Sequence, residues 1–217
     1  MDIFITYLRF AIPDHLIAAS GAHAAAVGIS VLLSSIIGIT LGCFAYRRRR
    51  LADISLAVAG TIITIPSFAL FALLVPFLGF GWPPTIVALT AYGVLPILRN
   101  TITGLQGVDS AVTDSAQGVG LSSRQRLFRI ELPLASPVII AGVRVSTLIL
   151  LGIAAIAAIV AGPGLGEDIF SGLARLGSAT ALYLVLSSVM FIVMLAIAFD
   201  IAFLLFRKFA ISKGIRQ

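Results

Sequence analysis

Five long, almost uncharged runs of residues decide what this chain can fold into. They cover residues 22–46, 54–80, 84–98, 138–161 and 181–206, and the only charged side chains within them are Arg144 and Asp200. A membrane-spanning helix needs about 20 apolar residues at a rise of about 1.5 Å per residue. Four runs reach that length alone, and the third reaches it if its helix continues through Arg99 to Gly104. The chain is therefore predicted to be an all-α membrane protein with five transmembrane helices.

The composition excludes an ordinary soluble domain. Of 217 residues, 59% are hydrophobic and 11% are charged, whereas soluble domains carry about 25% charged residues. We expect residues 1–20 to form an external tail or surface helix, 21–206 the membrane domain and 207–217 a cytoplasmic tail. Residues 1–20 lack the basic start and small-residue cleavage site of a signal peptide, so no cleaved leader is expected. The single cysteine, Cys43, excludes an intrachain disulfide.

Positive charges fall almost entirely on one side of the predicted membrane. With five spans, thirteen of the fifteen lysines and arginines share one face, and only Arg9 and Arg175 lie on the other. An excess of basic residues is typical of cytoplasmic loops. The distribution predicts an external N-terminus, a cytoplasmic C-terminus and a cytoplasmic loop at residues 105–137. It also accounts for the pI near 10.2 without nucleic-acid binding, so no nucleic-acid partner is expected.

The cytoplasmic loop begins with the signals of a short helix. Asp109 or Ser110 is placed to cap the N-terminus of a helix that runs to about Gln117. Gly118 and Gly120 are expected to end that helix by permitting left-handed backbone. A passive connector needs only a few residues, so a loop of this length with helix signals indicates a surface that docks onto another molecule.

A second short helix is predicted in the same loop. Ser122 and Gln125 have the spacing of a capping box, which favours a helix from there to about Ile130. Proline restricts the residue before it and cannot donate a backbone hydrogen bond. Leu132-Pro133 is therefore expected to end the second helix, and Pro137 to begin the next span.

This loop resembles the EAA motif of the permeases of bacterial ABC importers. That motif reads Glu-Ala-Ala, three residues, Gly, nine residues, Ile-x-Leu-Pro. Here the sequence 114–116 reads Asp114-Ser115-Ala116, and Gly120, Ile130, Leu132 and Pro133 follow at the motif's spacing. Five of the seven positions match, and Asp114 and Ser115 are the departures. The resemblance implies the fold of a type I importer permease, and it implies that these seven residues form the coupling helix that docks on an ATPase subunit.

Other segments resemble the permeases of osmoprotectant importers in particular. They are residues 64–67 (TIPS), 93–101 (GVLPILRNT), 131–135 (ELPLA), 141–144 (AGVR) and 162–166 (GPGLG). This resemblance implies import of glycine betaine, carnitine, choline or proline betaine across the bacterial cytoplasmic membrane. It implies cytoplasmic ATPase subunits that hold ATP and Mg, an extracytoplasmic substrate-binding protein, and a second permease copy or a sister permease. The chain itself is expected to bind no cofactor. Permeases for methionine and other small solutes share this architecture, and they remain the alternative.

Several residues inside the spans are candidates for the translocation pathway. Pro66 and Pro96 interrupt backbone hydrogen bonding, which is tolerated where a cavity or a neighbouring helix satisfies the freed groups. Phe68, Phe71 and Tyr92 offer aromatic faces at mid-depth, and such faces attract quaternary ammonium groups. The same five residues are equally compatible with helix packing, so both interpretations stay open.

Asp200 is the other pathway candidate, because a charge at the centre of a span costs about 2.5–3.5 kcal/mol. Arg207 follows seven residues later and is expected on the same helix face. Asp200 is therefore either paired, protonated or reaching the interface, or part of the pathway itself.

Two other classes of protein fit the sequence poorly. A membrane-embedded enzyme needs clustered catalytic groups, and Asp200 is the single acid in the spans. A secondary transporter is expected to show internal repeats with ion sites near the midplane, and it would leave the EAA-like loop unexplained. The glycines at 162–166 lack the Lys-Ser/Thr of a phosphate-binding loop. The chain is therefore predicted to be a transporter subunit and not an enzyme, without a metal site.

Overall fold

The protein folds into a helical bundle. The computed structural model describes residues 4–5, 7 and 15–210, so the predictions for most of residues 1–14 and for 211–217 lie outside the described residues. The helices are α2 (Ile17–Ala45), α3 (Arg49–Thr64), α4 (Ser67–Leu78), α5 (Trp82–Gln106), α6 (Ser110–Gly118), α7 (Ser123–Arg126), α8 (Leu132–Ile156), α9 (Gly166–Ala174) and α10 (Ala179–Ala210). A π-helical turn, η2 (Leu127–Glu131), joins α7 to α8, and a 3-10 turn, η3 (Ala157–Val160), follows α8. The described residues form no strand.

The transmembrane helices match the five predicted runs. Helices α2, α5, α8 and α10 are each long and apolar enough to cross a membrane. The fifth crossing is a broken one, because α3 and α4 meet at an angle of 95°. Counting that bent pair as one span gives the predicted five. The prediction that the third run continues as helix past Arg99 is also confirmed, since α5 extends to Gln106.

The break between α3 and α4 lies at Pro66, which forms the N-cap of α4. Proline has no N–H to continue the helix, and the residue before it favours extended backbone; Ile65 has a ψ of 128°. The carbonyl of Ile65 is left without a helical partner, and the hydroxyl of Tyr92 on α5 donates a hydrogen bond to it at 2.6 Å. A side chain of the central helix therefore stabilises the broken span.

Helix α5 is the centre of the bundle and packs closely on α2 and α8. Small residues permit this close approach. A Cβ atom added at Gly42 of α2 would lie 2.5 Å from Thr101, and one at Gly142 of α8 would lie 2.6 Å from Asn100. Gly38 and Gly42, spaced as GxxxG, thus pack within the chain against α5.

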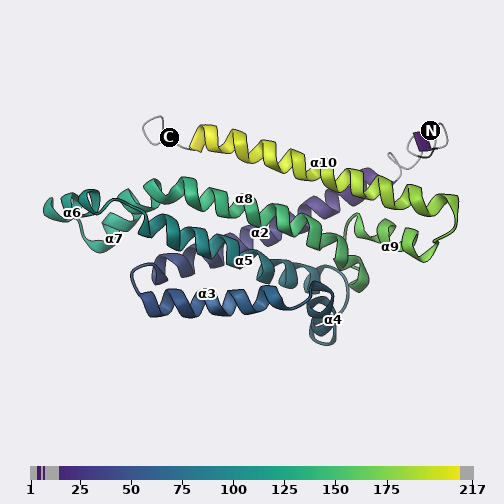
Figure 1. Ribbon diagram of the computed structural model, residues 1–217, viewed down its shortest axis with the longest axis horizontal. Helices are drawn as coiled ribbons and strands as arrows, with labels where there is room; N and C mark the ends of the chain where they lie inside the picture. Colours follow the sequence, from purple (N-terminus) through teal and green to yellow (C-terminus); the bar gives the residue numbers. More distant parts are fainter. Residues whose placement is uncertain (1–3, 6, 8–14, 211–217) are drawn as a thin grey trace.

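Helix α10 lies along one edge of the bundle (Figure 1), next to α8 and α9. A bidentate ion pair connects it to α8: Arg144 donates to the two carboxylate oxygens of Asp200 at 2.5 and 2.9 Å. The sequence pattern suggested Arg207 as the partner of Asp200. The structure pairs Asp200 with Arg144, and the side chain of Arg207 lies outside the described ones.

The two ends of the bundle differ in content. One end carries α6, α7, the turn between α2 and α3 and the C-terminal end of α10, whereas α4, α9 and the start of α10 lie at the other (Figure 1). The run Arg47–Arg50 spans the turn between α2 and α3 and the first two residues of α3. The structure therefore brings the arginine run and the EAA-like loop to the same end, as alternating spans require.

Candidate functional site

The EAA-like loop begins with a capped helix. The side chain of Asp109 accepts a hydrogen bond from the backbone N–H of Ala111 at 2.8 Å, which caps the N-terminus of α6. Helix α6 then runs to Gly118 and ends in a Schellman arrangement. In that arrangement the N–H of Leu121 donates to the carbonyl of Ala116 and the N–H of Gly120 to that of Gln117. The predicted first helix is confirmed.

Only one of the two predicted glycines adopts left-handed backbone in this turn. Gly120 has a φ of +85°, which side chains rarely tolerate, whereas Gly118 is the last residue of α6 and is not among the residues of positive φ. A single left-handed residue is enough to close a Schellman turn. The prediction for Gly120 is confirmed, and the prediction for Gly118 is wrong.

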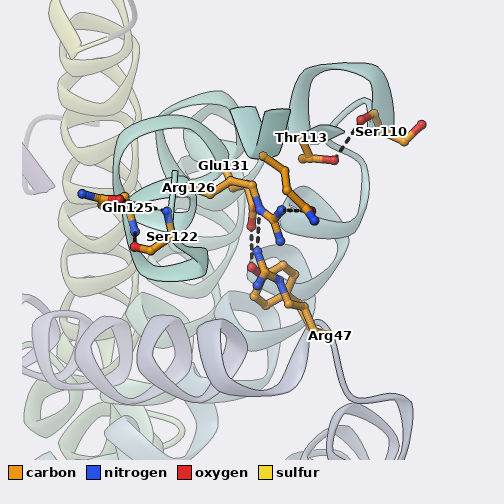
Figure 2. Close-up of polar contacts among 9 residues, drawn as sticks. Arg47, Ser110, Thr113, Ser122, Gln125, Arg126 and Glu131 are labelled. Atoms are coloured by element: carbon orange, nitrogen blue, oxygen red, sulfur yellow. Dashed lines mark hydrogen bonds and ion pairs between the residues drawn. The ribbon is translucent and has the colours of Figure 1, made fainter. Parts of the chain in front are cut away.

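The second helix begins as predicted but ends differently. Ser122 and Gln125 form a capping box, with hydrogen bonds of 2.9 and 3.3 Å between each side chain and the other residue's backbone (Figure 2). The helix does not stop at Leu132-Pro133. It continues through η2 into α8, and the N–H of Leu132 donates to the carbonyl of Leu127.

Two local features let this helix continue past its prolines. The π-helical turn η2 ends two residues before Pro133, and its wider i→i−5 hydrogen bonding accommodates the N–H that Pro133 lacks. Pro137 then frees the carbonyl of Pro133, and the hydroxyl of Ser136 donates to that carbonyl at 2.8 Å. The predicted helix end at 132–133 is therefore wrong, because the π-helical turn accommodates Pro133 and the Ser136 hydroxyl binds the carbonyl that Pro137 leaves free.

The residues of the EAA-like motif divide into an exposed group and a packed group. Asp114, Ser115, Gly120 and Pro133 are exposed. Ala116 is buried, and both Ala116 and Ile130 line a groove of about 490 Å³ beside α6. Leu132 packs against the buried residues Leu105, Ala135 and Ile139 at the end of the bundle. The motif thus joins a solvent-facing helix to the core of the spans.

The loop also contains a buried carboxylate that the sequence analysis did not single out. Glu131 is 2% exposed and accepts hydrogen bonds from Arg47 at 2.7 Å, from Arg126 at 3.0 Å and from the hydroxyl of Tyr46. Arg126 also donates to Gln117 of α6 at 2.9 Å. Figure 2 shows Arg47 and Arg126 reaching Glu131 from different elements. We call these five residues the Glu131 cluster.

The Glu131 cluster connects four elements of the protein. Tyr46 and Arg47 follow α2, Gln117 belongs to α6, Arg126 ends α7 and Glu131 precedes α8. Burial and the hydrogen bond to Glu131 raise the pKa of the Tyr46 hydroxyl, so it remains a proton donor at neutral pH. Charge-assisted hydrogen bonds of this kind are about twice as strong as neutral ones. The cluster therefore fixes the loop onto the ends of α2 and α8.

The pathway candidates are found at two separate places. Pro66, Phe68, Phe71 and Tyr92 gather near the break between α3 and α4, where Phe71 and Tyr92 are buried in the core and Phe68 is 54% exposed. Asp200 is on α10, and Figure 1 shows α10 and α4 on opposite edges of the bundle.

Pro96 lies inside α5 and is half-buried. Its carbonyl accepts a hydrogen bond from the side-chain amide of Asn100 at 2.8 Å.

The fold and the loop together define a helical membrane protein that presents an ordered, capped helix beside its spans. Residues 34–210 match the family described as binding-protein-dependent transport system inner membrane component, and the chain belongs to that family. It is a multi-pass inner-membrane protein and the permease subunit of an ABC importer, and the resemblance seen in the sequence is confirmed.

Similar proteins and structures agree with this family. The chain is 43% identical over 145 residues to the choline transport system permease protein OpuBB of Bacillus subtilis, which is 67% of each chain. It is 41% identical over 154 residues to the glycine betaine/carnitine/choline transport system permease protein OpuCB of the same organism, 71% of each chain. It is 34% identical to the osmoprotectant import permease protein OsmW of Salmonella typhimurium, over 89% of this chain and 91% of that one. The inward-facing MetNI methionine ABC transporter shares its fold, with a TM-score of 0.80 and 18% identity over 93% and 96% of the two chains.

Proposed function

We propose that this permease imports quaternary-ammonium osmoprotectants such as glycine betaine, carnitine, choline or proline betaine. The observation that carries the proposal is the identity of 34–43% to permeases named for choline, glycine betaine, carnitine and osmoprotectant transport. The structural neighbour named for methionine is only 18% identical and supports the alternative solute far less.

The chemistry of the spans fits such a solute. A quaternary ammonium group carries a permanent charge and no hydrogen-bond donor, so aromatic faces suit it and a fixed cation repels it. The arginine within α8, Arg144, is neutralised by Asp200. We place the pathway near the break at Pro66, where Phe68 is exposed, with Pro96 on the neighbouring central helix. Phe71 and Tyr92 support this segment from the core, and Asp200 serves mainly to hold α10.

The coupling role is assigned to the loop. We propose that α6 docks on a cytoplasmic ATPase subunit that holds ATP and Mg, through the exposed Asp114 and Ser115 and the groove formed with Ala116 and Ile130. The external N-terminus and cytoplasmic C-terminus expected from the charges place the loop on the ATPase side. We assign residues 21–206 to the membrane domain, as the sequence predicts.

The mechanism follows from the Glu131 cluster and belongs to the same proposal. ATP binding closes two ATPase subunits, and α6 moves with the subunit on which it docks. Because the cluster fixes the loop to α2 and α8, that movement reaches the spans of this permease and of a second copy or sister permease. A cavity then opens outward to take the solute from the extracytoplasmic binding protein, and hydrolysis returns it to the inward-facing state.

Radiolabelled uptake tests the solute. The complete system is expressed in a strain that lacks other betaine carriers, and uptake of glycine betaine, choline and methionine is compared. We expect ATP-dependent accumulation of a quaternary amine and none of methionine. Accumulation of methionine alone would contradict the proposed solute and leave the permease assignment intact.

A further inference from the structure

A second cavity lies at the end of the bundle that carries the loop. It has a volume of about 580 Å³, within the range of about 300–1,000 Å³ that is typical of ligand sites. The last turns of α2 form one wall, with Cys43 and Phe44, and the segment from α7 to the start of α8 forms the other, with Leu127 and Phe128. Arg47, Arg48 and Arg124 also line it. The cavity is thus apolar along its walls and basic at one end.

The charges at this cavity are not all balanced by the protein. Arg47 is bound to Glu131. Among the described residues, Arg48 and Arg124 have no acidic partner within 4.0 Å. These two arginines are 76 positions apart in the sequence, and folding brings both to one cavity. They attract an anion that no residue in the described part of the chain supplies.

The position of the cavity identifies the kind of anion. Phe44 is 72% exposed on a membrane-spanning helix, and Arg47 and Arg48 follow directly after that helix ends. The cavity therefore extends from the hydrocarbon layer to the level of the lipid headgroups. A soluble anion would leave the apolar wall uncovered, and an apolar helix of another subunit would leave both arginines unpaired. A phospholipid satisfies both, because its phosphate accepts hydrogen bonds from guanidinium groups and its acyl chain covers the apolar wall.

We infer that the cavity between the end of α2 and the α7–α8 segment binds one anionic phospholipid, with its headgroup on Arg48 and Arg124 and an acyl chain along Phe44. The inference requires only that α2 spans the membrane, so it holds for any transported solute. Since η2 and Arg126 belong to the same segment as this wall, the bound lipid lies directly beside the Glu131 cluster.

Native mass spectrometry of the intact transporter tests the site. The purified, delipidated complex of the permease with its ATPase subunits is titrated with phosphatidylglycerol or phosphatidylcholine of identical acyl chains. We expect one phosphatidylglycerol per permease at concentrations at which phosphatidylcholine is not retained. Each basic residue near an anionic lipid contributes about 1 kcal/mol, so Arg48→Gln with Arg124→Gln should weaken phosphatidylglycerol binding about thirtyfold.

A matched variant separates a defined site from general attraction to a basic surface. Arg50→Gln with Arg129→Gln removes the same number of charges at positions two and five residues further along the chain, but neither residue lines the cavity. This control should bind phosphatidylglycerol as the unchanged protein does. A third variant, Thr40→Trp, fills the apolar part of the cavity without altering any charge and should also weaken binding.

Three results would overturn the inference. Equal retention of the two lipids would exclude recognition of the headgroup charge. Equal losses in the two arginine variants would mean that only the general surface charge attracts lipid. If Arg48→Gln with Arg124→Gln released an ATPase or permease subunit while lipid binding stayed unchanged, the cavity would be a subunit interface.

Discussion

Replacing Glu131 by glutamine tests whether the Glu131 cluster transmits movement from the loop to the spans. The amide keeps the size of the side chain but removes the charge that Arg47 and Arg126 share. Breaking a buried ion pair by removing one partner costs about 3–5 kcal/mol. Here the side chain of Arg47 is 37% exposed and that of Arg126 is 15% exposed, so both regain some hydration. Arg126 also keeps its hydrogen bond to Gln117.

We therefore expect the attachment of the loop to weaken by about 2–4 kcal/mol, which raises the detached population about 30- to 700-fold. Hydrogen–deuterium exchange should become faster in α6 and α7 and stay unchanged in the core of α5. In reconstituted vesicles, the amount of solute imported per ATP hydrolysed should fall, because the ATPases still close while less of their movement reaches α2 and α8.

Glu167→Gln is the matched control, because it removes the same charge from the chain's other glutamate, which is exposed on α9. This control should match the unchanged protein in both measurements. If Glu131→Gln also left the exchange of α6 and the transport ratio unchanged, the cluster would have no part in coupling. If it slowed uptake and ATP hydrolysis in equal proportion, its role would lie in assembly and not in transmission.

Two further predictions concern the turn after α6 and the attachment of α10. Gly120→Val should strain the turn by about 1–3 kcal/mol at its φ of +85°, and it should reduce uptake without reducing membrane insertion. Gly118→Val is the control, because a side chain there also meets no neighbouring atom, and it should leave uptake unchanged. Equal uptake in the two variants would refute this prediction. Arg144→Gln and Asp200→Asn should each lower the unfolding temperature of the detergent-solubilised protein. The double variant should lose less stability than the sum of the two single losses, by a coupling energy of about 0.5–3 kcal/mol. Strict additivity of the losses would show that the ion pair contributes nothing.

The sequence predicted the features of this fold that depend on neighbouring residues. Run lengths indicated the five spans, and the caps at Asp109 and Ser122 followed from hydrogen-bonding groups within three residues. The glycine at 120 was predicted to be left-handed for the same local reason, and the structure agrees.

The errors and omissions arose where distant or compensating groups decide the structure. The helix was expected to end at Pro133, but the π-helical turn before it accommodates that proline, and Ser136 binds the carbonyl that Pro137 frees, so the helix continues. Glu131 lies 84 positions from Arg47, so no local pattern reveals that they pair. A lone acid at the edge of an apolar run was the one available signal. The partner of Asp200 was sought seven residues away on its own helix, whereas packing of α10 on α8 supplies Arg144 instead.

The central claim, that α6 is the surface on which the ATPase docks, is tested most directly by site-specific photo-crosslinking in intact cells. A photoreactive amino acid is placed at Val119, which is 79% exposed directly after α6, or at Leu176, which is 78% exposed in the turn between α9 and α10. These two segments lie at opposite ends of the bundle (Figure 1). We predict that the reagent at Val119 attaches to the ATPase subunit and that the one at Leu176 does not. Capture of the ATPase from Leu176, or its absence at Val119 in a variant that still imports solute, would contradict the docking role of α6 and the orientation of the chain.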